Sequence, residues 1–396
     1  MQDTHRSTGP SGPTALVCSN SSWYLHNFRR GLIQALLAQG WRVITVAPHD
    51  EHSAALQALG AEFEPLPIDS KGLNPLADGR TCWHLAGLMQ RYQPQVYLPF
   101  TIKPVIWGGL AARWRKVATV ATVTGLGTAF IRQNWLTKLV CNLYRPALRR
   151  ASTVLFQNDE DRSLFLKHGL VTVRQTGLVA GSGVDLKRFK PTPLPNGEAP
   201  VFLLIARMLR DKGVVEYVNA AREIKARYPQ ARFQMLGFVG VANRTAISRD
   251  EIDGWQAEGI VDYLGSTDDV RPFIAAADCV VLPSYREGTP RTLLEAAAMT
   301  RPLIATDVTG CREVVEHEVN GYLCEARNHQ SLATAIERFI QLPMAARYAM
   351  GLAGRQKIEQ TFDQASVVQA YLQAIHTAVN GRGAGETVAS KFPSSS

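Results

Sequence analysis

Short runs rich in β-branched and aromatic residues alternate with segments of helical periodicity along almost the whole chain. Strands that follow one another through helices lie parallel, because each helix carries the chain back across the sheet. The helical pattern is clearest over Ser22–Ala38, Asn134–Arg150 and Gln364–Val379. The predicted strands are Ala15–Cys18, Arg42–Ala47, Glu62–Leu66, Gln95–Leu98, Val117–Val123, Thr153–Phe156, Val173–Thr176, Val201–Ile205, Arg232–Leu236, Val261–Leu264, Cys279–Leu282 and Pro302–Ala305. The alternation therefore predicts an α/β fold built on parallel sheets.

One segment interrupts the alternation. Residues 186–200 read LKRFKPTPLPNGEAP, with four prolines and no periodicity, which is typical of a linker. A chain of 396 residues, 46% of them apolar, can fill a core on each side of it. We predict two doubly wound, Rossmann-like domains facing each other across a cleft, over residues 14–185 and 201–360. A C-terminal helix over 361–380 is expected to cross back to the first domain, between disordered tails at 1–13 and 381–396.

The remaining composition favours a cytoplasmic protein. The six cysteines include no CxxC pair, which is typical of reduced thiols. There is no run of 18 uncharged apolar residues, so no transmembrane helix is predicted. The first residues are polar and lack the apolar segment of a secretion signal.

The net charge of +9 is concentrated in one block. Residues 79–158 contain no Asp or Glu but eleven Lys or Arg, together with four of the seven tryptophans. Basic residues interleaved with Trp and Leu favour an anionic membrane surface as a partner. The alternative is that buried segments of a parallel sheet are simply poor in acids. Nucleic acid is not an expected partner, because no helix-turn-helix or zinc-finger motif is present.

Two acidic residues follow the predicted strand at 279–282. Pro290 suits the first turn of a helix, which places Glu287 in the preceding loop and Glu295 one to two turns inside the helix. Carboxylates accept paired hydrogen bonds from the vicinal hydroxyls of a ribose or hexose, and the free amides at a helix start receive phosphate. The alternative is a solvated loop acid and a helix acid paired with Arg291 four residues earlier.

Two basic residues follow the predicted strand at 201–205. Arg207 can bind phosphate through two nitrogens and Lys212 supplies a point charge. Together they would balance the two acids and stabilise a departing diphosphate. The alternative is a basic surface turn paired with Asp211.

Three segments carry a resemblance to a known family. PSYREGTPRTLLEAAA around Glu287 and Glu295, IARMLRDKGV around Arg207 and SGVDLKRF at 182–189 resemble the retaining glycosyltransferases of family 4, which have the GT-B fold. The resemblance covers about residues 15–379. Segments 21–32 and 123–130 are most similar to the subgroup that extends polyprenyl-diphosphate-linked sugars.

The resemblance implies a role for each matching residue. Arg207 and Lys212 would bind the donor diphosphate, Glu295 the nucleotide ribose, and Glu287 would face the donor sugar, so that Glu287, Arg207 and Lys212 form the catalytic group. No metal site and no covalent intermediate are implied. Relatives have a glycine-rich loop after the first strand that this chain lacks, and backbone amides at Ser22, or at Gly125 and Gly127, remain alternatives for that contact. The substrate-binding residues are then Glu295, Gly288, Thr289, Leu294, Ser22, Gly125 and Gly127.

The predicted activity is transfer of a hexose or N-acetylhexosamine, with retention, from a nucleotide sugar to a lipid-linked saccharide. We expect UDP-sugar as donor, no required cofactor, and a peripheral location at the inner face of the cytoplasmic membrane. Two alternatives stay open: a transferase with a soluble acceptor, and a non-catalytic nucleotide-sugar-binding protein. The pair Glu287 and Glu295 argues against the second.

Overall fold

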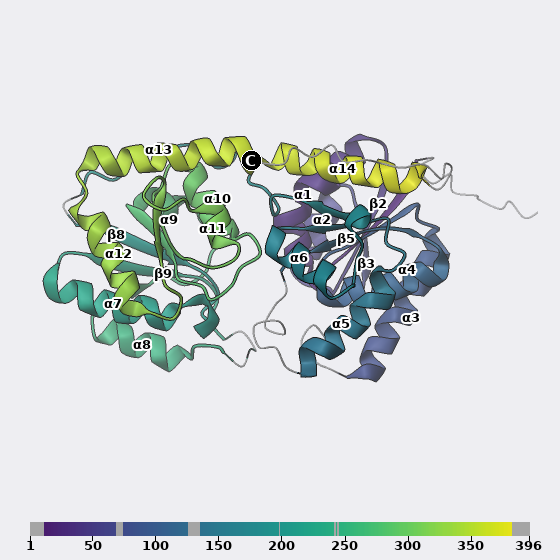
Figure 1. Cartoon of the computed structure of the whole chain (residues 1–396), viewed down its shortest axis with the longest axis horizontal. Helices are drawn as coiled ribbons and strands as arrows, with labels where there is room; N and C mark the ends of the chain where they lie inside the picture. The colour runs from purple at the N-terminus through teal and green to yellow at the C-terminus, as the bar shows by residue number, and fades with distance from the viewer. Residues whose placement is uncertain are drawn as a thin grey trace, which may run out of the picture. The chain divides into compact units, whose positions relative to one another are not determined.

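The structure, a computed structural model, describes residues 12–68, 74–125, 135–197, 199–240, 243 and 245–381. Contacts divide these residues into two units. Unit 1 holds the chain up to Phe156, Arg162–Gly177 and the chain from Val368 onward, and unit 2 holds Gln157–Asp161 and Leu178–Val367. Each unit is one sheet flanked by helices (Figure 1), which confirms the predicted α/β class with two Rossmann-like domains.

The sheet of unit 1 has the order β3-β2-β1-β4-β5-β6-β7. The pairs β1–β2, β2–β3, β1–β4, β4–β5 and β5–β6 are parallel. The strand order reverses between β1 and β4, which is where a doubly wound sheet opens for ligands at its carboxyl edge. The strands are β1 (Thr14–Cys18), β2 (Arg42–Ala47), β3 (Glu62–Pro65), β4 (Val96–Pro99), β5 (Ala118–Val123), β6 (Thr153–Phe156) and β7 (Thr176–Leu178).

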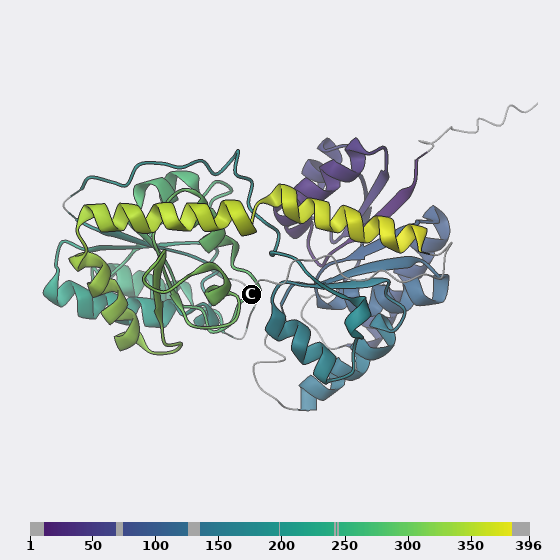
Figure 2. The same cartoon turned by 45° about the horizontal axis from the view of Figure 1, so that its top comes forward.

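Helices cover both faces of this sheet (Figures 1 and 2). Side chains alternate along β5, so Ala121 and Val123 pack against α5, whereas the Thr122 hydroxyl lies 3.0 Å from the Tyr371 hydroxyl of α14. Arg29 of α1 is buried on that second face, where it donates to the Tyr371 hydroxyl at 3.2 Å and lies 4.2 Å from the Phe100 ring centre. The helices are α1 (Ser22–Ala38), α2 (Ser53–Ala58), α3 (Pro75–Tyr92), the π-helix η1 (Pro104–Gly108), α4 (Gly109–Arg115), α5 (Trp135–Leu148), α6 (Asp159–Lys167), the 3₁₀ helix η3 (Val173–Gln175) and α14 (Gln364–Asn380).

The sheet of unit 2 has the order β10-β9-β8-β11-β12-β13, reversing between β8 and β11. Phe202 and Leu204 of β8 join the core beneath α7 and α12, and the intervening Leu203 joins the core beneath α10. The strands are β8 (Val201–Ile205), β9 (Arg232–Leu236), β10 (Asp262–Tyr263), β11 (Cys279–Leu282), β12 (Leu303–Thr306) and β13 (Gly321–Cys324). The helices are η4 (Arg210–Lys212), α7 (Val214–Arg227), α8 (Arg249–Ala257), α9 (Arg271–Ala276), α10 (Arg291–Ala298), α11 (Cys311–Val314), α12 (His329–Gln341) and α13 (Met344–Thr361).

Two predictions of secondary structure need correction. The strand predicted at Val173–Thr176 is wrong, because Thr172 and Gln175 form a capping box that starts η3, and β7 begins only at Thr176. Strand β13 was not predicted. The predicted tails lie almost entirely outside the described residues, and so does Gly127.

Candidate functional site

The predicted charged residues of unit 2 gather at one edge of its sheet. Strands β8 and β11 are parallel neighbours, so their carboxyl ends lie side by side. Arg207 and Lys212 follow β8, and Glu287 follows β11. Glu295 lies on α10, whose Thr292 hydroxyl donates to the Ile205 carbonyl at the end of β8 at 3.1 Å. The site is therefore built at the switch point of the sheet.

Lys212 and Glu287 form an ion pair in which both side chains are largely buried. The turn that carries Lys212 is fixed to the β11 loop by the Asp211 carbonyl, which accepts from the Tyr285 N–H at 2.9 Å and from the Ser284 hydroxyl at 3.1 Å. The next residue, Gly213, has φ +73°, and a Cβ there would lie 2.0 Å from the Pro283 carbonyl oxygen. The close approach that pairs the two side chains thus requires glycine.

The backbone of the Glu287–Gly288 loop is held by its neighbours. The Glu287 N–H donates to the Thr309 carbonyl at 3.2 Å. Gly310 has φ +84°, and a Cβ at this residue would lie 2.4 Å from the Gly288 carbonyl oxygen, so glycine leaves room for the loop. The Asn158 amide donates to the same Gly288 carbonyl at 3.4 Å. The loop that was predicted to contact the donor sugar therefore has a fixed path.

A buried acid supports this loop and was missed by the sequence analysis. Asp161 is fully buried and pairs with Arg286, next to Glu287. Burial raises the pKa of the Asp161 carboxyl, and Arg286 partly opposes that shift. Asp161 and Arg286 both belong to unit 2, but they lie 125 residues apart in the sequence, so no local pattern indicates the pairing.

Tyr285 and Glu216 form a second support that was not predicted. The Tyr285 hydroxyl donates to Glu216 Oε1 of α7 at 2.6 Å, and the Arg327 guanidinium lies 4.7 Å from the Tyr285 ring centre. Burial, with a contribution from Glu216, raises the pKa of the Tyr285 hydroxyl, which therefore stays protonated and acts as a donor. The pair ties the first turn of α7 to the β11 loop.

Glu295 is buried and accepts from Arg291 Nε at 2.6 Å, so the helix pairing considered above is present. Burial raises the pKa of the Glu295 carboxyl, and Arg291 opposes the shift. A carboxylate has about four acceptor positions. The Arg291 contact therefore leaves Glu295 able to accept from further hydroxyl groups.

Arg207 stands apart from the other three. Its side chain is exposed and has no hydrogen bond or ion pair with any residue that the structure describes. Lys212 pairs with Glu287 and not with Asp211, so the alternative of a basic surface turn closed by Asp211 does not describe Lys212. Arg207 is left as an accessible positive charge beside the pair. Leu294 is buried in the core beneath α10, which makes it a packing residue; its side chain does not line an open site.

Two of the predicted residues of unit 1, Ser22 and Gly125, lie at the carboxyl edge of that unit's sheet. Ser22 begins α1 directly after β1, and its hydroxyl donates to the Pro48 carbonyl at 2.6 Å. Gly125 follows β5 with φ +124°, a backbone conformation that favours glycine. Over the described ranges, no group of three His, Cys, Asp or Glu side chains is arranged to hold a metal ion. Nor is any helix in those ranges long and apolar enough to cross a bilayer.

Two family descriptions match the chain. One, glycosyl transferase 4-like, covers residues 15–158, and the other, glycosyl transferases group 1, covers residues 199–341. The chain belongs to these glycosyltransferase families. The second match contains Arg207, Lys212, Glu287 and Glu295, and the first contains Ser22 and Gly125.

Two curated relatives of this glycosyltransferase have names that give a lipid-linked sugar as their substrate. It is 27% identical over 344 residues to the N,N'-diacetylbacillosaminyl-diphospho-undecaprenol alpha-1,3-N-acetylgalactosaminyltransferase of Campylobacter jejuni, covering 82% of this chain and 88% of the relative. It is 23% identical over 287 residues to the UDP-Gal:alpha-D-GlcNAc-diphosphoundecaprenol alpha-1,3-galactosyltransferase of Escherichia coli, covering 69% and 73%. The resemblance to the subgroup acting on polyprenyl-diphosphate-linked sugars is thereby confirmed.

Solved structures agree on the fold. The Anabaena protein HepE in complex with UDP-glucose matches with a TM-score of 0.76 at 18% identity, over 92% of this chain and 99% of that one. Sucrose-phosphate synthase from Thermosynechococcus elongatus matches with a TM-score of 0.74 at 20% identity, over 92% and 98%. The glycosyltransferase has the GT-B fold.

Proposed function

We propose that this glycosyltransferase moves a hexose or N-acetylhexosamine from a UDP-sugar to a polyprenyl-diphosphate-linked saccharide, with retention at the anomeric carbon, during synthesis of a bacterial surface or glycoprotein glycan. The observation that carries the proposal is the buried Lys212–Glu287 pair at the β8–β11 switch point, with Glu295 on the adjoining helix. The names of the Campylobacter and Escherichia coli relatives support the lipid-linked acceptor.

Donor binding follows from the charges at this site. Arg207 and Lys212 bind the diphosphate, Arg207 by two nitrogens and Lys212 as a compact charge. Glu295 accepts hydrogen bonds from the ribose hydroxyls through the acceptor positions that Arg291 leaves open. Glu287 and the Gly288–Thr289 backbone face the sugar, on a loop whose path is fixed by Gly310 and Asn158.

Transfer is a substitution at the anomeric carbon. The bond from that carbon to the diphosphate oxygen breaks, and its electron pair leaves with UDP, where Arg207 and Lys212 stabilise the developing charge. An acceptor hydroxyl attacks from the same face, and its proton passes to a departing phosphate oxygen. The chain's own cations supply the electrostatic stabilisation, so we propose that no metal or other cofactor is required.

The acceptor side is assigned to unit 1. The lipid-linked acceptor would bind at the carboxyl edge of unit 1, where Ser22 and Gly125 lie, and the basic block of residues 79–158 suits an anionic membrane surface. We propose that the enzyme is a peripheral protein at the cytoplasmic face of the membrane and that nucleic acid is not a partner.

Donor and acceptor are tested together with purified full-length protein. UDP-sugars are screened by thermal stabilisation, and stabilising sugars are then assayed for turnover with a polyprenyl-diphosphate sugar and with soluble sugars. Turnover with the lipid-linked acceptor alone is expected. Turnover with soluble sugars only would replace this proposal by a soluble-acceptor transferase, and stabilisation without any turnover would replace it by a binding protein.

The residue roles are tested by paired variants. Glu295→Ala is expected to weaken UDP binding about tenfold or more, because a buried acceptor of sugar hydroxyls is lost. Glu287→Ala is expected to lower kcat more than it changes UDP affinity. Glu223→Ala is the control, since Glu223 is an exposed acid in the same kind of four-residue helix pair, with Arg227 at 3.3 Å. Small and equal effects of the two site variants would contradict the assigned roles.

A further inference from the structure

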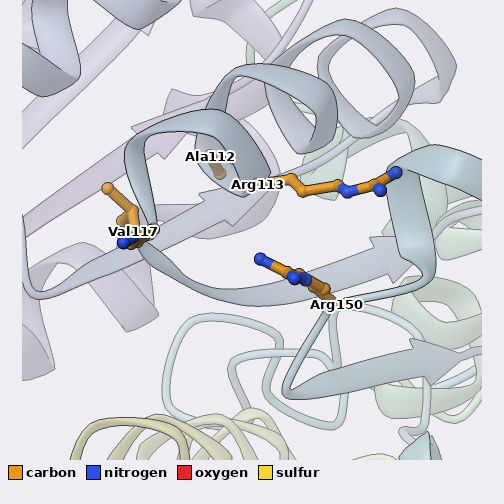
Figure 3. Close-up of a pocket in the computed structure, with 5 residues that line it drawn as sticks. Ala112, Arg113, Val117 and Arg150 are labelled. Atoms are coloured by element: carbon orange, nitrogen blue, oxygen red, sulfur yellow. The ribbon is translucent and has the colours of Figure 1, made fainter.

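A basic cavity lies at the edge of unit 1 opposite to the edge where Ser22 and Gly125 lie. It has a volume of about 370 Å³ and is lined by Ala112, Arg113, Lys116, Val117 and Arg150. Val117 directly precedes β5 and Arg150 lies shortly before β6, so the cavity opens at the amino ends of these parallel strands. Figure 3 shows Arg113 and Arg150 extending into one space from α4 and from the loop before β6. The cavity is therefore separate from the carboxyl edge where the acceptor is proposed to bind.

The positive charge in the cavity is not neutralised by the surrounding residues. Arg113 donates to the Pro146 carbonyl at 3.3 Å, whereas Lys116 and Arg150 are exposed and have no ion pair with a described residue. Residues 79–158 contain no acid in the sequence, and Asp78, just before them, is already paired with Lys103 at 2.7 Å. The three cations thus face a space in which an anion would find no competing carboxylate among the described residues.

Helix dipoles explain only part of this charge. The cavity lies at the carboxyl ends of α4 (Gly109–Arg115) and α5 (Trp135–Leu148), and basic residues are favoured at such ends. Each helix end carries roughly half a negative elementary charge. Two ends offset about one of the three positive charges, so roughly two remain in excess for a ligand anion.

An exposed pair of tryptophans includes a residue of α4, the helix that also carries Arg113. Trp114 adjoins Arg113 on α4, and its ring centre lies 5.9 Å from that of Trp83 on α3. Trp83 is 70% exposed and Trp114 58% exposed, and Leu76, two turns before Trp83 on α3, is 77% exposed. Trp and Tyr concentrate where an apolar phase meets water, because the indole ring has an apolar body and a polar N–H group. Exposed Trp and Leu side chains in a segment rich in basic residues are complementary to an anionic lipid bilayer.

We propose that the Arg113–Lys116–Arg150 cavity binds the phosphate of an anionic membrane lipid while Trp83 and Trp114 enter the interface of the same bilayer. This inference deepens the proposed function, since it names the surface through which the enzyme reaches the membrane that holds its acceptor. The two basic groups on flexible, exposed stems, Lys116 and Arg150, adjust to the headgroup, and Arg113 is held in place by the Pro146 carbonyl. Attraction is electrostatic at long range, and the indoles then add apolar burial.

The test measures binding to vesicles that contain no polyprenyl lipid. Full-length protein is floated with vesicles of phosphatidylcholine alone, and with vesicles in which about one lipid in three is the anionic phosphatidylglycerol. Binding is expected only with phosphatidylglycerol, and it should weaken as salt rises, because exposed charges are screened. Lys116→Asn/Arg150→Ala removes two charges from exposed positions, and Asn suits the left-handed backbone of Lys116 at φ +57°. Its partition coefficient should fall about 25-fold, about fivefold for each charge removed.

Matched variants separate this surface from general charge and general hydrophobicity. Lys190→Ala/Arg232→Ala removes two charges from exposed residues of unit 2, and Tyr348→Ala removes a 52% exposed aromatic side chain of α13. Both are expected to bind vesicles within about twofold of wild type, whereas Trp83→Ala/Trp114→Ala should lose about tenfold or more. Equal losses in the control and cavity variants, or no vesicle binding by the wild-type protein, would overturn the proposal.

A second readout keeps this proposal distinct from the proposed function. Transfer is measured with a short-chain polyprenyl-diphosphate sugar in detergent, where no bilayer is present. The cavity and tryptophan variants are expected to keep the wild-type rate there while losing it on acceptor embedded in phosphatidylglycerol vesicles. Loss of the detergent rate in these variants would refute the docking role, because it would place the residues in the catalytic machinery. A wild-type protein that binds vesicles but transfers to no acceptor would refute the proposed function alone.

Discussion

Gly213 is the residue on which the pairing of Lys212 with Glu287 most directly depends. It has φ +73°, and a Cβ at this position would lie 2.0 Å from the Pro283 carbonyl oxygen and 2.6 Å from its carbon. Both atoms are backbone at the end of β11, so no side chain can turn away to make room. Replacement by alanine must therefore separate the Lys212 turn from the β11 loop, and with it Lys212 from Glu287.

Two energies add in Gly213→Ala. The left-handed backbone conformation costs an alanine roughly 1–2 kcal/mol. Relief of the overlap requires a movement of about 1 Å, and such overpacking costs about 1–3 kcal/mol. The free energy of unfolding should therefore fall by about 2–5 kcal/mol. A displacement of about 1 Å at a charged binding group also costs up to about 100-fold in turnover, because the geometry of reaction is lost.

Gly259→Ala is the matched control for this experiment. Gly259 also has a positive φ, +69°, but a Cβ there meets nothing within 4 Å. The control should show the backbone cost of about 1–2 kcal/mol and wild-type UDP affinity. Urea unfolding gives the two free energies, and titration with UDP gives the two affinities. If Gly213→Ala binds UDP as tightly as Gly259→Ala, the close approach of the two loops does not position the site.

Three further predictions follow from buried polar groups. Burial raises the pKa of Glu295, so as the pH falls this carboxyl gains a proton at values where an exposed glutamate is still ionised. The Kd for UDP should therefore rise with falling pH. In calorimetric titrations, Glu295→Gln should bind UDP weakly and lose this pH dependence. Arg301 is buried and donates to the carbonyls of Ile274 at 2.9 Å, Pro193 at 2.7 Å and Ala275 at 2.9 Å. Arg301→Met should therefore lower the free energy of unfolding, measured in urea, by about 3–5 kcal/mol. The control Arg249→Met, at an exposed position, should change it by less than about 1 kcal/mol. Tyr371→Phe removes the hydroxyl that joins Arg29 of α1 and Thr122 of β5 to α14, and should cost about 1–3 kcal/mol by the same measurement. The same substitution at the exposed Tyr348 of α13 should not reproduce this loss.

The strands were predictable because their signal is local. Residues 42–47, 153–156, 201–205, 232–236 and 279–282 form strands with the bounds that the sequence indicates, since each is a short apolar run ended by turn residues. Val173–Thr176 reads as β-branched too, yet the side chain of Gln175 bonds back to the Thr172 backbone and to the carbonyls of Leu148 and Ala151. Such polar contacts outweigh a weak strand propensity and are not visible in the residue pattern.

The charged residues of the site were predictable for a related reason, and their supports were not. Arg207, Lys212 and Glu287 each follow a strand closely, so the parallel sheet alone brings them to one edge. Asp161 and Glu216 reach the same loop from residues 125 and 69 positions away from their partners. Local spacing carries no information about such pairs. What indicates them is the need to neutralise the buried Asp161 carboxylate and to satisfy the half-buried Tyr285 hydroxyl, and both needs appear only once burial is known.

The charges of the site also give a reason for the different roles that we propose for its two acids. Without donor, Lys212 is paired with Glu287, and Arg291 with Glu295, so each acid neutralises one cation; of Arg207, Lys212 and Arg291, only Arg207 is exposed. In the proposed mode of donor binding the diphosphate contacts Lys212, and it therefore competes with Glu287 for that ammonium group. Glu295 does not compete, because its partner Arg291 lies on its own helix four residues away. Removal of Glu287 frees Lys212 for phosphate, which offsets any lost contact and leaves UDP affinity nearly unchanged while turnover falls. Removal of Glu295 frees nothing that the diphosphate uses, so its loss appears directly as weaker nucleotide binding.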